Sequence, residues 1–171
     1  MKPTLILPLV LAMTGTSAFA QPAVDGRAWY VDVIKGAPQA RLYFGVPEID
    51  DVGLTLSCPP GSGQVTASFR VAKQLADRQV GGVWVDKAGI KAPWPASVKL
   101  TSGAASSTLR GKASADELDG GSFISVEVAT RAPVIASFAK TGLVQATALG
   151  ETISHPVATL RLVRKFLSAC K

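Results

Sequence analysis

Apolar and polar residues alternate along most of the chain in short blocks, which Gly, Pro, Asp and Ser separate. In residues 52–58, for example, Leu54, Leu56 and Cys58 occupy every second position. Because successive side chains of a strand point to opposite faces, this period of two predicts antiparallel β-strands rather than helices or βαβ units. The predicted strands are 28–34, 40–46, 52–58, 64–71, 80–85, 96–101, 106–112, 122–130, 134–138 and 143–149.

This strand content predicts a mainly β fold, an antiparallel β-sandwich or barrel of about nine strands. Residues 91–95 contain two prolines, each of which removes a ladder donor, so we predict a loop there. Trp94 belongs to this loop. Two interpretations stay open for it: an exposed anchor for a partner, or a ring folded over the core.

Helical spacing occurs in one segment, at the end of the sequence. Its apolar residues fall on one helix face and its basic residues fall mainly on the other. The sequence therefore predicts one C-terminal amphipathic α-helix, with Ser154 or His155 as its cap and Pro156 in its first turn. The apolar face consists of Val157, Leu160, Val163, Leu167 and Cys170.

The first twenty residues have the three zones of a secretory signal peptide. Lys2 is basic, an apolar run follows from Leu5 to Met13, and small residues precede a cleavage site after Ala20. The run is shorter than the ~20 residues that a membrane-spanning helix needs. We therefore expect residues 1–20 to be a signal peptide, residues 21–171 to form a single β-rich domain, and the mature protein to be periplasmic or secreted without a membrane span.

The sequence contains two cysteines, Cys58 and Cys170. An exported chain with an even number of cysteines is most simply a disulfide protein. Cys58 shares a strand face with Leu54 and Leu56, and Cys170 belongs to the apolar face of the predicted helix. We therefore predict a disulfide bond between Cys58 and Cys170, with both sulfur atoms in the core.

Charge and composition exclude several function classes. Loss of Lys2 with the leader leaves 17 basic and 12 acidic residues, so the mature chain carries about +5, which we interpret as ordinary solubility charge. The export signal and the lack of a basic stripe interleaved with aromatics argue against nucleic-acid binding. The single His, His155, provides neither a zinc site nor a convincing catalytic triad, and no phosphate-binding or dinucleotide motif occurs. We therefore expect no catalytic residues, no metal and no cofactor.

Carboxylates are the remaining catalytic candidates. Asp50 and Asp51 form the densest acidic group, and Asp116, Glu117 and Asp119 form a second one. Both groups adjoin turns, where Asp usually accepts hydrogen bonds from local backbone donors. An envelope hydrolase that uses these acidic turns is one alternative, and Asp50 and Asp51 are retained as possible binding residues. The other aromatic residues are predicted to be mostly core: Trp29, Tyr30, Tyr43, Phe44, Phe69, Trp84, Phe123, Phe138 and Phe166.

Parts of the chain resemble two groups of exported proteins. The first resemblance is to a group of small uncharacterised exported proteobacterial proteins. It is carried by Trp29, by LYFGVPEIDD at 42–51, by LTLSC at 54–58 and by FLSAC at 166–170. The group has a Tyr-Gly-x-Pro-x-x-Asp stretch, into which this chain inserts Phe44 after the Tyr. That resemblance implies no activity. A weaker similarity, carried by Ser57-Cys58 and Ser102-Gly103-Ala104, is to periplasmic lysozyme inhibitors of the membrane-bound/C-type class, which are small β-barrels. It implies a role for Ser102 and Gly103 in binding.

The leading hypothesis is a non-catalytic periplasmic or secreted binding protein whose partner is an envelope protein or a polysaccharide. The alternatives are an inhibitor of an envelope hydrolase such as lysozyme, and an envelope hydrolase. The sequence leaves the ligand and the oligomeric state open.

Overall fold

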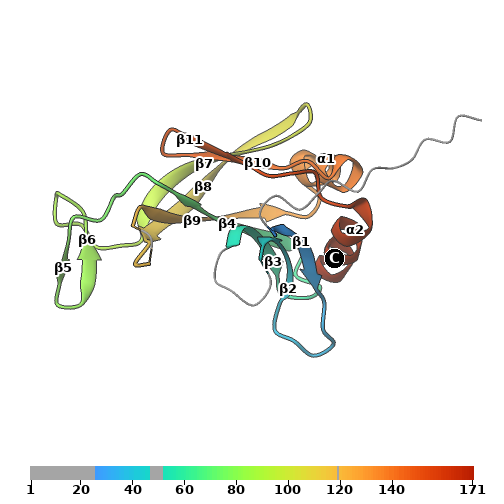
Figure 1. Ribbon diagram of the computed structural model, residues 1–171, viewed down its shortest axis with the longest axis horizontal. Helices are drawn as coiled ribbons and strands as arrows, with labels where there is room; N and C mark the ends of the chain where they lie inside the picture. The colour runs from blue at the N-terminus through green and yellow to red at the C-terminus, as the bar shows by residue number, and fades with distance from the viewer. Residues whose placement is uncertain (1–25, 47–51, 119) are drawn as a thin grey trace, which may run out of the picture.

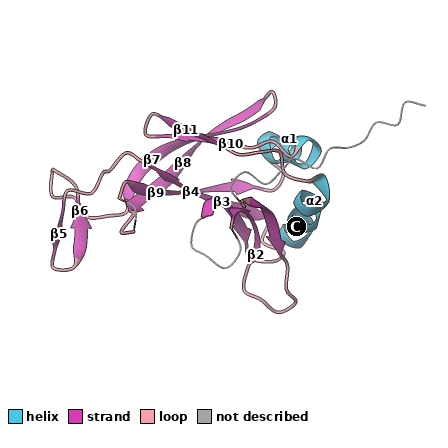
Figure 2. Ribbon diagram, viewed as in Figure 1, coloured by secondary structure: helices cyan, strands magenta, loops and turns pink. Residues whose placement is uncertain are grey.

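The computed structural model describes residues 26–46, 52–118 and 120–171. The predicted signal peptide and the candidate residues Asp50 and Asp51 lie outside the described residues. Within the described part, strands predominate and two helices occur (Figure 2). The elements are β1 (Ala28–Asp32), β2 (Ala40–Gly45), β3 (Val52–Cys58), β4 (Gln64–Val71), β5 (Arg78–Val80), β6 (Val83–Val85), β7 (Trp94–Ser102), β8 (Ala105–Ala115), β9 (Ser122–Ala129), α1 (Pro133–Thr141), β10 (Gln145–Ala148), β11 (Glu151–Ser154) and α2 (Leu160–Cys170).

Nine of the described strands form one antiparallel sheet in the order β1-β2-β3-β4-β9-β8-β7-β10-β11. The sheet curls, so that β11 approaches the end of β4 (Figure 1). There the carboxylate of Glu151 accepts hydrogen bonds from the backbone N–H groups of Ala72 and Lys73, at 2.9 and 2.7 Å. The predicted mainly β, antiparallel fold with a C-terminal helix is confirmed.

The core fills the inside of the curl, and the period of two in the sequence explains it. In β4, for instance, Val65, Ala67, Phe69 and Val71 are buried, whereas the residues between them are not. The two helices lie side by side at one end of the sheet (Figure 1), where α2 contacts β1 and β2, and α1 contacts β7 and β8. Val163, Phe166 and Leu167 of α2 are buried against this core.

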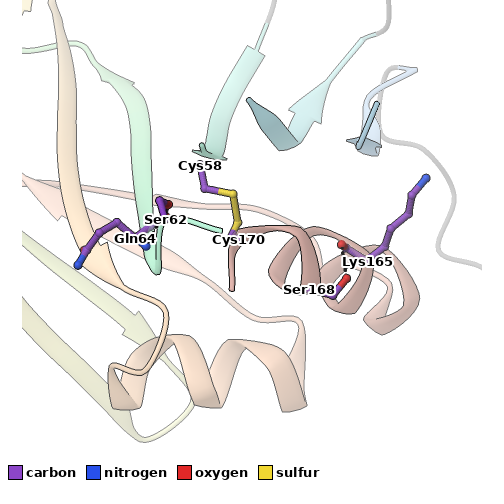
Figure 3. The surroundings of a disulfide bond; sticks show 6 residues. All are labelled: Cys58, Ser62, Gln64, Lys165, Ser168 and Cys170. Atoms are coloured by element: carbon purple, nitrogen blue, oxygen red, sulfur yellow. Dashed lines mark hydrogen bonds between the residues drawn. A yellow bond between two sulfur atoms is a disulfide. The ribbon is translucent and has the colours of Figure 1, made fainter. Parts of the chain in front are cut away.

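The predicted disulfide is confirmed. Cys58 at the end of β3 and Cys170 at the end of α2 are bonded and almost fully buried, with their Cα atoms 5.6 Å apart (Figure 3). The turn after Cys58 also satisfies the last carbonyl groups of α2, because Gly61 N–H donates to Ala169 O at 2.9 Å and Gly63 N–H donates to Cys170 O at 2.8 Å. Carbonyl groups at a helix end otherwise lack an intrahelical partner. The covalent bond and these hydrogen bonds therefore fix α2 at the same place.

The start of the C-terminal helix differs from the prediction. Ser154 ends β11, and α2 begins only at Leu160, with Thr159 as its N-cap residue. His155 and Pro156 instead belong to the segment that connects β11 to α2. The indole N–H of Trp29 donates to Pro156 O at 2.7 Å, which anchors this segment to β1.

Two predicted strands are wrong or incomplete. Residues 134–138 are helical, because Pro133 begins α1 and Gly142 ends it in the left-handed conformation (φ 68°) that glycine adopts readily. Residues 80–85 do not form one strand, because Gly81 and Gly82 both have positive φ and turn the chain between β5 and β6. This small hairpin projects at the end of the molecule opposite the helices (Figure 1).

The predicted loop at 91–95 is only partly present, because Trp94 is the first residue of β7. Its ring is buried and its N–H donates to Ile90 O at 2.9 Å. Pro95 is tolerated in this strand because β10 pairs with β7 only from Val98 onward, so the first part of β7 has β8 as its sheet neighbour. Trp94 is therefore a core residue and not an exposed anchor.

Candidate functional site

The candidate site is a groove on the outer, polar face of the sheet, across β2, β3 and β4. Its volume is about 540 Å³, within the range of roughly 300–1,000 Å³ that is typical of small-molecule sites. The groove lies opposite the face that carries the core. It is lined by Asp32, Gln39, Arg41, Tyr43, Val46, Val52, Thr55, Ser57, Ser68 and Phe123.

The strand register arranges several of these side chains, together with the neighbouring Tyr30, in two rows that run across the strands. Tyr43 is opposite Tyr30 on one side and Thr55 on the other, and Thr55 is in turn opposite Ser68. Side chains that face each other across antiparallel strands lie within contact distance. The first row therefore runs from two aromatic rings to two hydroxyl groups.

The second row is charged at one end. Asp32 is opposite Arg41, and Arg41 is opposite Ser57. The charges of Asp32 and Arg41 balance, so this row presents a carboxylate, a guanidinium and a hydroxyl group with no net charge. Carboxylate and guanidinium groups together offer both acceptors and donors to a ligand.

Tyr30 and Tyr43 stack on each other with their ring centroids 5.5 Å apart and their planes 27° from parallel. Burial raises the pKa of the Tyr43 phenol above its ordinary value of 10.0, Asp32 and Tyr30 raise it further, and Arg41 acts in the opposite direction. The phenol therefore keeps its proton at neutral pH and can both donate and accept a hydrogen bond. Phe123, 39% exposed, adds an apolar wall.

The prediction that the aromatic residues are mostly core misses Tyr30, Tyr43 and Phe123. The alternation of apolar and polar positions along each strand could have predicted their outward orientation. In β2, Leu42 and Phe44 are buried, so Tyr43 between them must point to the other face. Phe123 precedes the buried Ile124 in β9 and points outward for the same reason.

The other sequence-predicted candidates are not in this groove. The Ser102 side chain is buried, and its hydroxyl lies 3.2 Å from that of Thr141 in α1. Its carbonyl accepts a hydrogen bond from the Ser137 hydroxyl at 2.7 Å. Ser102 thus fastens the β7–β8 turn to α1, while Gly103 and Ala104 stay exposed at the tip.

The second acidic group also has structural contacts. Asp116 forms a salt bridge with Arg70 at 3.0 Å, and the Glu117 carboxylate accepts a hydrogen bond from the Trp84 indole at 2.7 Å. Asp119 lies outside the described residues. Glu117 therefore links the β5–β6 hairpin to the β8–β9 turn.

The single imidazole lies on the core side of the sheet, away from the groove. His155 packs against Phe44, with ring centroids 4.7 Å apart, and edge-on against Trp29 at 6.2 Å. Burial lowers its pKa below the ordinary 6.5, and the Arg27 cation lowers it further. Its Nε2 atom is buried without a hydrogen-bond partner among the described residues.

The groove hydroxyls of Thr55, Ser57 and Ser68 therefore have no imidazole beside them, since the chain has one His. Within the described residues, no three His, Cys, Asp or Glu side chains are grouped so that they could hold a metal ion. In the same residues, no helix has the length and apolar character needed to cross a membrane.

The chain matches no protein-family profile, no curated protein and no solved structure with which it was compared. A function must therefore be inferred from the groove itself. Its chemistry combines aromatic ring faces with neutral hydroxyls and a balanced pair of charges.

Proposed function

We propose that the protein is a non-catalytic binding protein of the cell envelope and that it binds a glycan in the outer groove. The observation that carries the proposal is the row formed by Tyr30, Tyr43, Thr55 and Ser68. A pyranose ring has C–H groups on its faces and hydroxyl groups around its rim. An aromatic surface beside short hydroxyl side chains matches both parts of such a ring.

The charged row supports the same ligand class. Asp32, Arg41 and Gln39 line the groove and are planar polar groups that can each make paired hydrogen bonds to neighbouring sugar hydroxyls. The balanced charge of Asp32 and Arg41 favours a neutral or weakly charged glycan over a strongly anionic polymer. The open form of the groove also suits a polymer, since a chain can continue past its ends.

The leader-like residues 1–20 and the buried Cys58–Cys170 bond support the proposed location outside the cytoplasm. Disulfide bonds of this kind persist mainly in oxidising compartments. Polysaccharides are abundant outside the cytoplasm, so an exported protein with this groove meets its ligand there.

Isothermal titration of the mature protein with an N-acetylglucosamine tetrasaccharide, and sedimentation with purified peptidoglycan sacculi, test the proposal. We expect saturable binding with micromolar to millimolar affinity. Tyr43→Ala should weaken binding at least about tenfold, because it removes the stacking surface. Arg41→Gln should weaken it less.

Arg110→Gln is the matched control, because Arg110 is an exposed arginine on β8 that does not line this groove. It should leave the affinity within about twofold. Equal effects of Arg41→Gln and Arg110→Gln, or no binding to any of a panel of envelope glycans, would overturn the proposed site. Release of shortened glycan, detected by mass spectrometry, would overturn the non-catalytic assignment.

A further inference from the structure

The positive charge of the chain is concentrated in its last quarter. Residues 130–171 contain six Lys and Arg side chains and a single carboxylate side chain, Glu151, whereas residues 21–129 contain eleven of each sign. The excess therefore comes from residues 130–171 and is not spread over the whole length of the chain. The six cations are Arg131, Lys140, Arg161, Arg164, Lys165 and Lys171.

The fold brings these cations to one end of the molecule. All six are exposed, and they belong to α1, α2 and the residues next to them, which lie side by side (Figure 1). Among the described residues, none of the six forms a salt bridge with a carboxylate. Glu151 does not neutralise them, because its carboxylate is bound to Ala72 and Lys73 at the end of β4.

A groove of about 530 Å³ runs between α1 and α2 at this end. Its floor is apolar and consists of Ile135, Ala136 and Ala139 from α1 and Leu167 from α2. Ala136 is exposed and Ala139 is half-buried, so two small side chains leave the space open. The groove is separate from the glycan site, which lies on the outer face of β2 to β4.

Two of the cations that line this groove follow residues whose backbones are hydrogen-bonded to Gly63. Thr130 N–H donates to Gly63 O at 2.9 Å, and Gly63 N–H donates to Cys170 O at 2.8 Å. These bonds place the backbone segments that carry Arg131 and Lys171, the residues that follow Thr130 and Cys170, on the two sides of Gly63. Both line the groove. Lys140 lines it from the last turn of α1, roughly 10 Å along the helix axis from Pro133, the first helical residue.

We propose that this groove binds a fatty acid or another free single-chain lipid with an anionic head group. The carboxylate or phosphate lies between Arg131 and Lys171, where two cations can share it. The acyl chain lies along Ile135, Ala139 and Leu167 toward Lys140. Two of the three lining cations, Arg131 and Lys171, provide for the head group, and the apolar floor between them and Lys140 provides for the chain of such a lipid. An acidic amphipathic helix would need cations along its whole length.

Dodecanoate below its micelle-forming concentration is the probe, with dodecanol and dodecyltrimethylammonium as neutral and cationic analogues of the same chain length. Isothermal titration should show one site for dodecanoate and at least about tenfold weaker binding of both analogues. Arg131→Gln should weaken dodecanoate binding about tenfold. Ala136→Phe, which places a large side chain in the groove from an exposed position, should abolish it while the circular dichroism spectrum stays unchanged.

Arg161→Gln is the matched control, because Arg161 is an exposed cation of α2 that does not line the groove. It should change the affinity less than twofold. Absence of dodecanoate binding at millimolar concentration, or equal binding of the cationic analogue, would overturn the proposal. A second experiment measures binding of the protein to phosphatidylglycerol vesicles. If Arg131→Gln and Arg161→Gln weaken strong vesicle binding equally and Ala136→Phe has no effect, the cations make a diffuse contact with a membrane surface. That result would overturn the groove site.

Discussion

The two ends of the molecule are built very differently. Around α2, the chain is held by the Cys58–Cys170 bond, by the hydrogen bond from Trp29 to Pro156, and by the packing of His155 on aromatic rings. At the opposite end, the β5–β6 hairpin has strands of three residues each, and every residue of β5 is exposed. Val80 is 51% exposed there.

This contrast indicates where the molecule is rigid. Regions with few buried apolar contacts open locally at low free energy, whereas a densely packed end opens only with the whole domain. The hairpin is linked to the β8–β9 turn through Trp84, whose indole N–H donates to the Glu117 carboxylate at 2.7 Å. Asp77 N–H donates to Val85 O at 2.8 Å and closes the base of the hairpin itself. Both proposed binding grooves use elements of the sheet and the helices, not the hairpin.

The disulfide should be the largest single contributor to the rigid end. Replacing Cys58 and Cys170 by Ser opens a loop with a sequence separation of 112 and should lower the free energy of unfolding by about 4 kcal/mol. Urea unfolding followed by tryptophan fluorescence measures this change. In this variant, amide hydrogen exchange in α2 should become faster than in the wild-type protein, and the increase should be larger in α2 than in the rest of the domain. An unchanged unfolding midpoint would contradict the view that this bond fixes the helix.

Gly53 gives a sharper test of the same end. A Cβ atom at position 53 would come within 2.6 Å of Cε1 of His155, whose ring is held between Trp29 and Phe44. Gly53→Ala should therefore destabilise the protein by about 1–3 kcal/mol through overpacking. In the His155→Ala background the same change should cost much less. Equal costs in the two backgrounds, measured by urea unfolding, would show that His155 does not limit the space at this position.

The sequence predicted much of the rigid end, because its signals are local. The strands predicted at 52–58 and 64–71 from the period of two have the same bounds as β3 and β4. The even number of cysteines predicted the disulfide. The helix α1 was missed because Val134 and Ile135 are β-branched and favour strands, although Pro133 and Gly142 flank the segment as they flank helices.

The candidate sites were harder to predict. The outer groove depends on register: Tyr43 lies beside Thr55, and Thr55 beside Ser68, only because β2, β3 and β4 pair with a particular alignment. Alternation places each side chain on the outer face, yet it does not show which residues meet there. Likewise, the cations of residues 130–171 are visible in the sequence, but only the fold places Arg131 and Lys171 in the lining of one groove.

The pH dependence of stability should also differ between the two ends. The pKa of His155 is lowered in the folded state, so below about pH 6.5 the unfolded chain binds a proton that the folded chain does not. This group's contribution to stability is complete above that pH and is lost as the pH falls toward the folded-state pKa.

The variant His155→Phe removes the imidazole and keeps a ring in place. Between about pH 7 and pH 5 the urea midpoint of the wild-type protein should fall more steeply than that of the variant. Parallel pH profiles of the two proteins would show that His155 titrates equally in the folded and unfolded states. The hairpin contains no His, so Val83→Thr should have the wild-type profile.

The smallest expected effect is in the hairpin itself. Val83 is 38% exposed, so Val83→Thr replaces a methyl group by a hydroxyl group that water can still reach, and the free energy of unfolding should change by less than about 0.5 kcal/mol. The same exchange at Val126, which is 2% exposed in β9, places a hydroxyl group in the core and should cost about 1–3 kcal/mol. Urea unfolding of both variants, read by tryptophan fluorescence, compares one chemical change at the two kinds of site. A large loss at Val83 would mean that the hairpin unfolds together with the sheet, and the two ends would then belong to one cooperative unit.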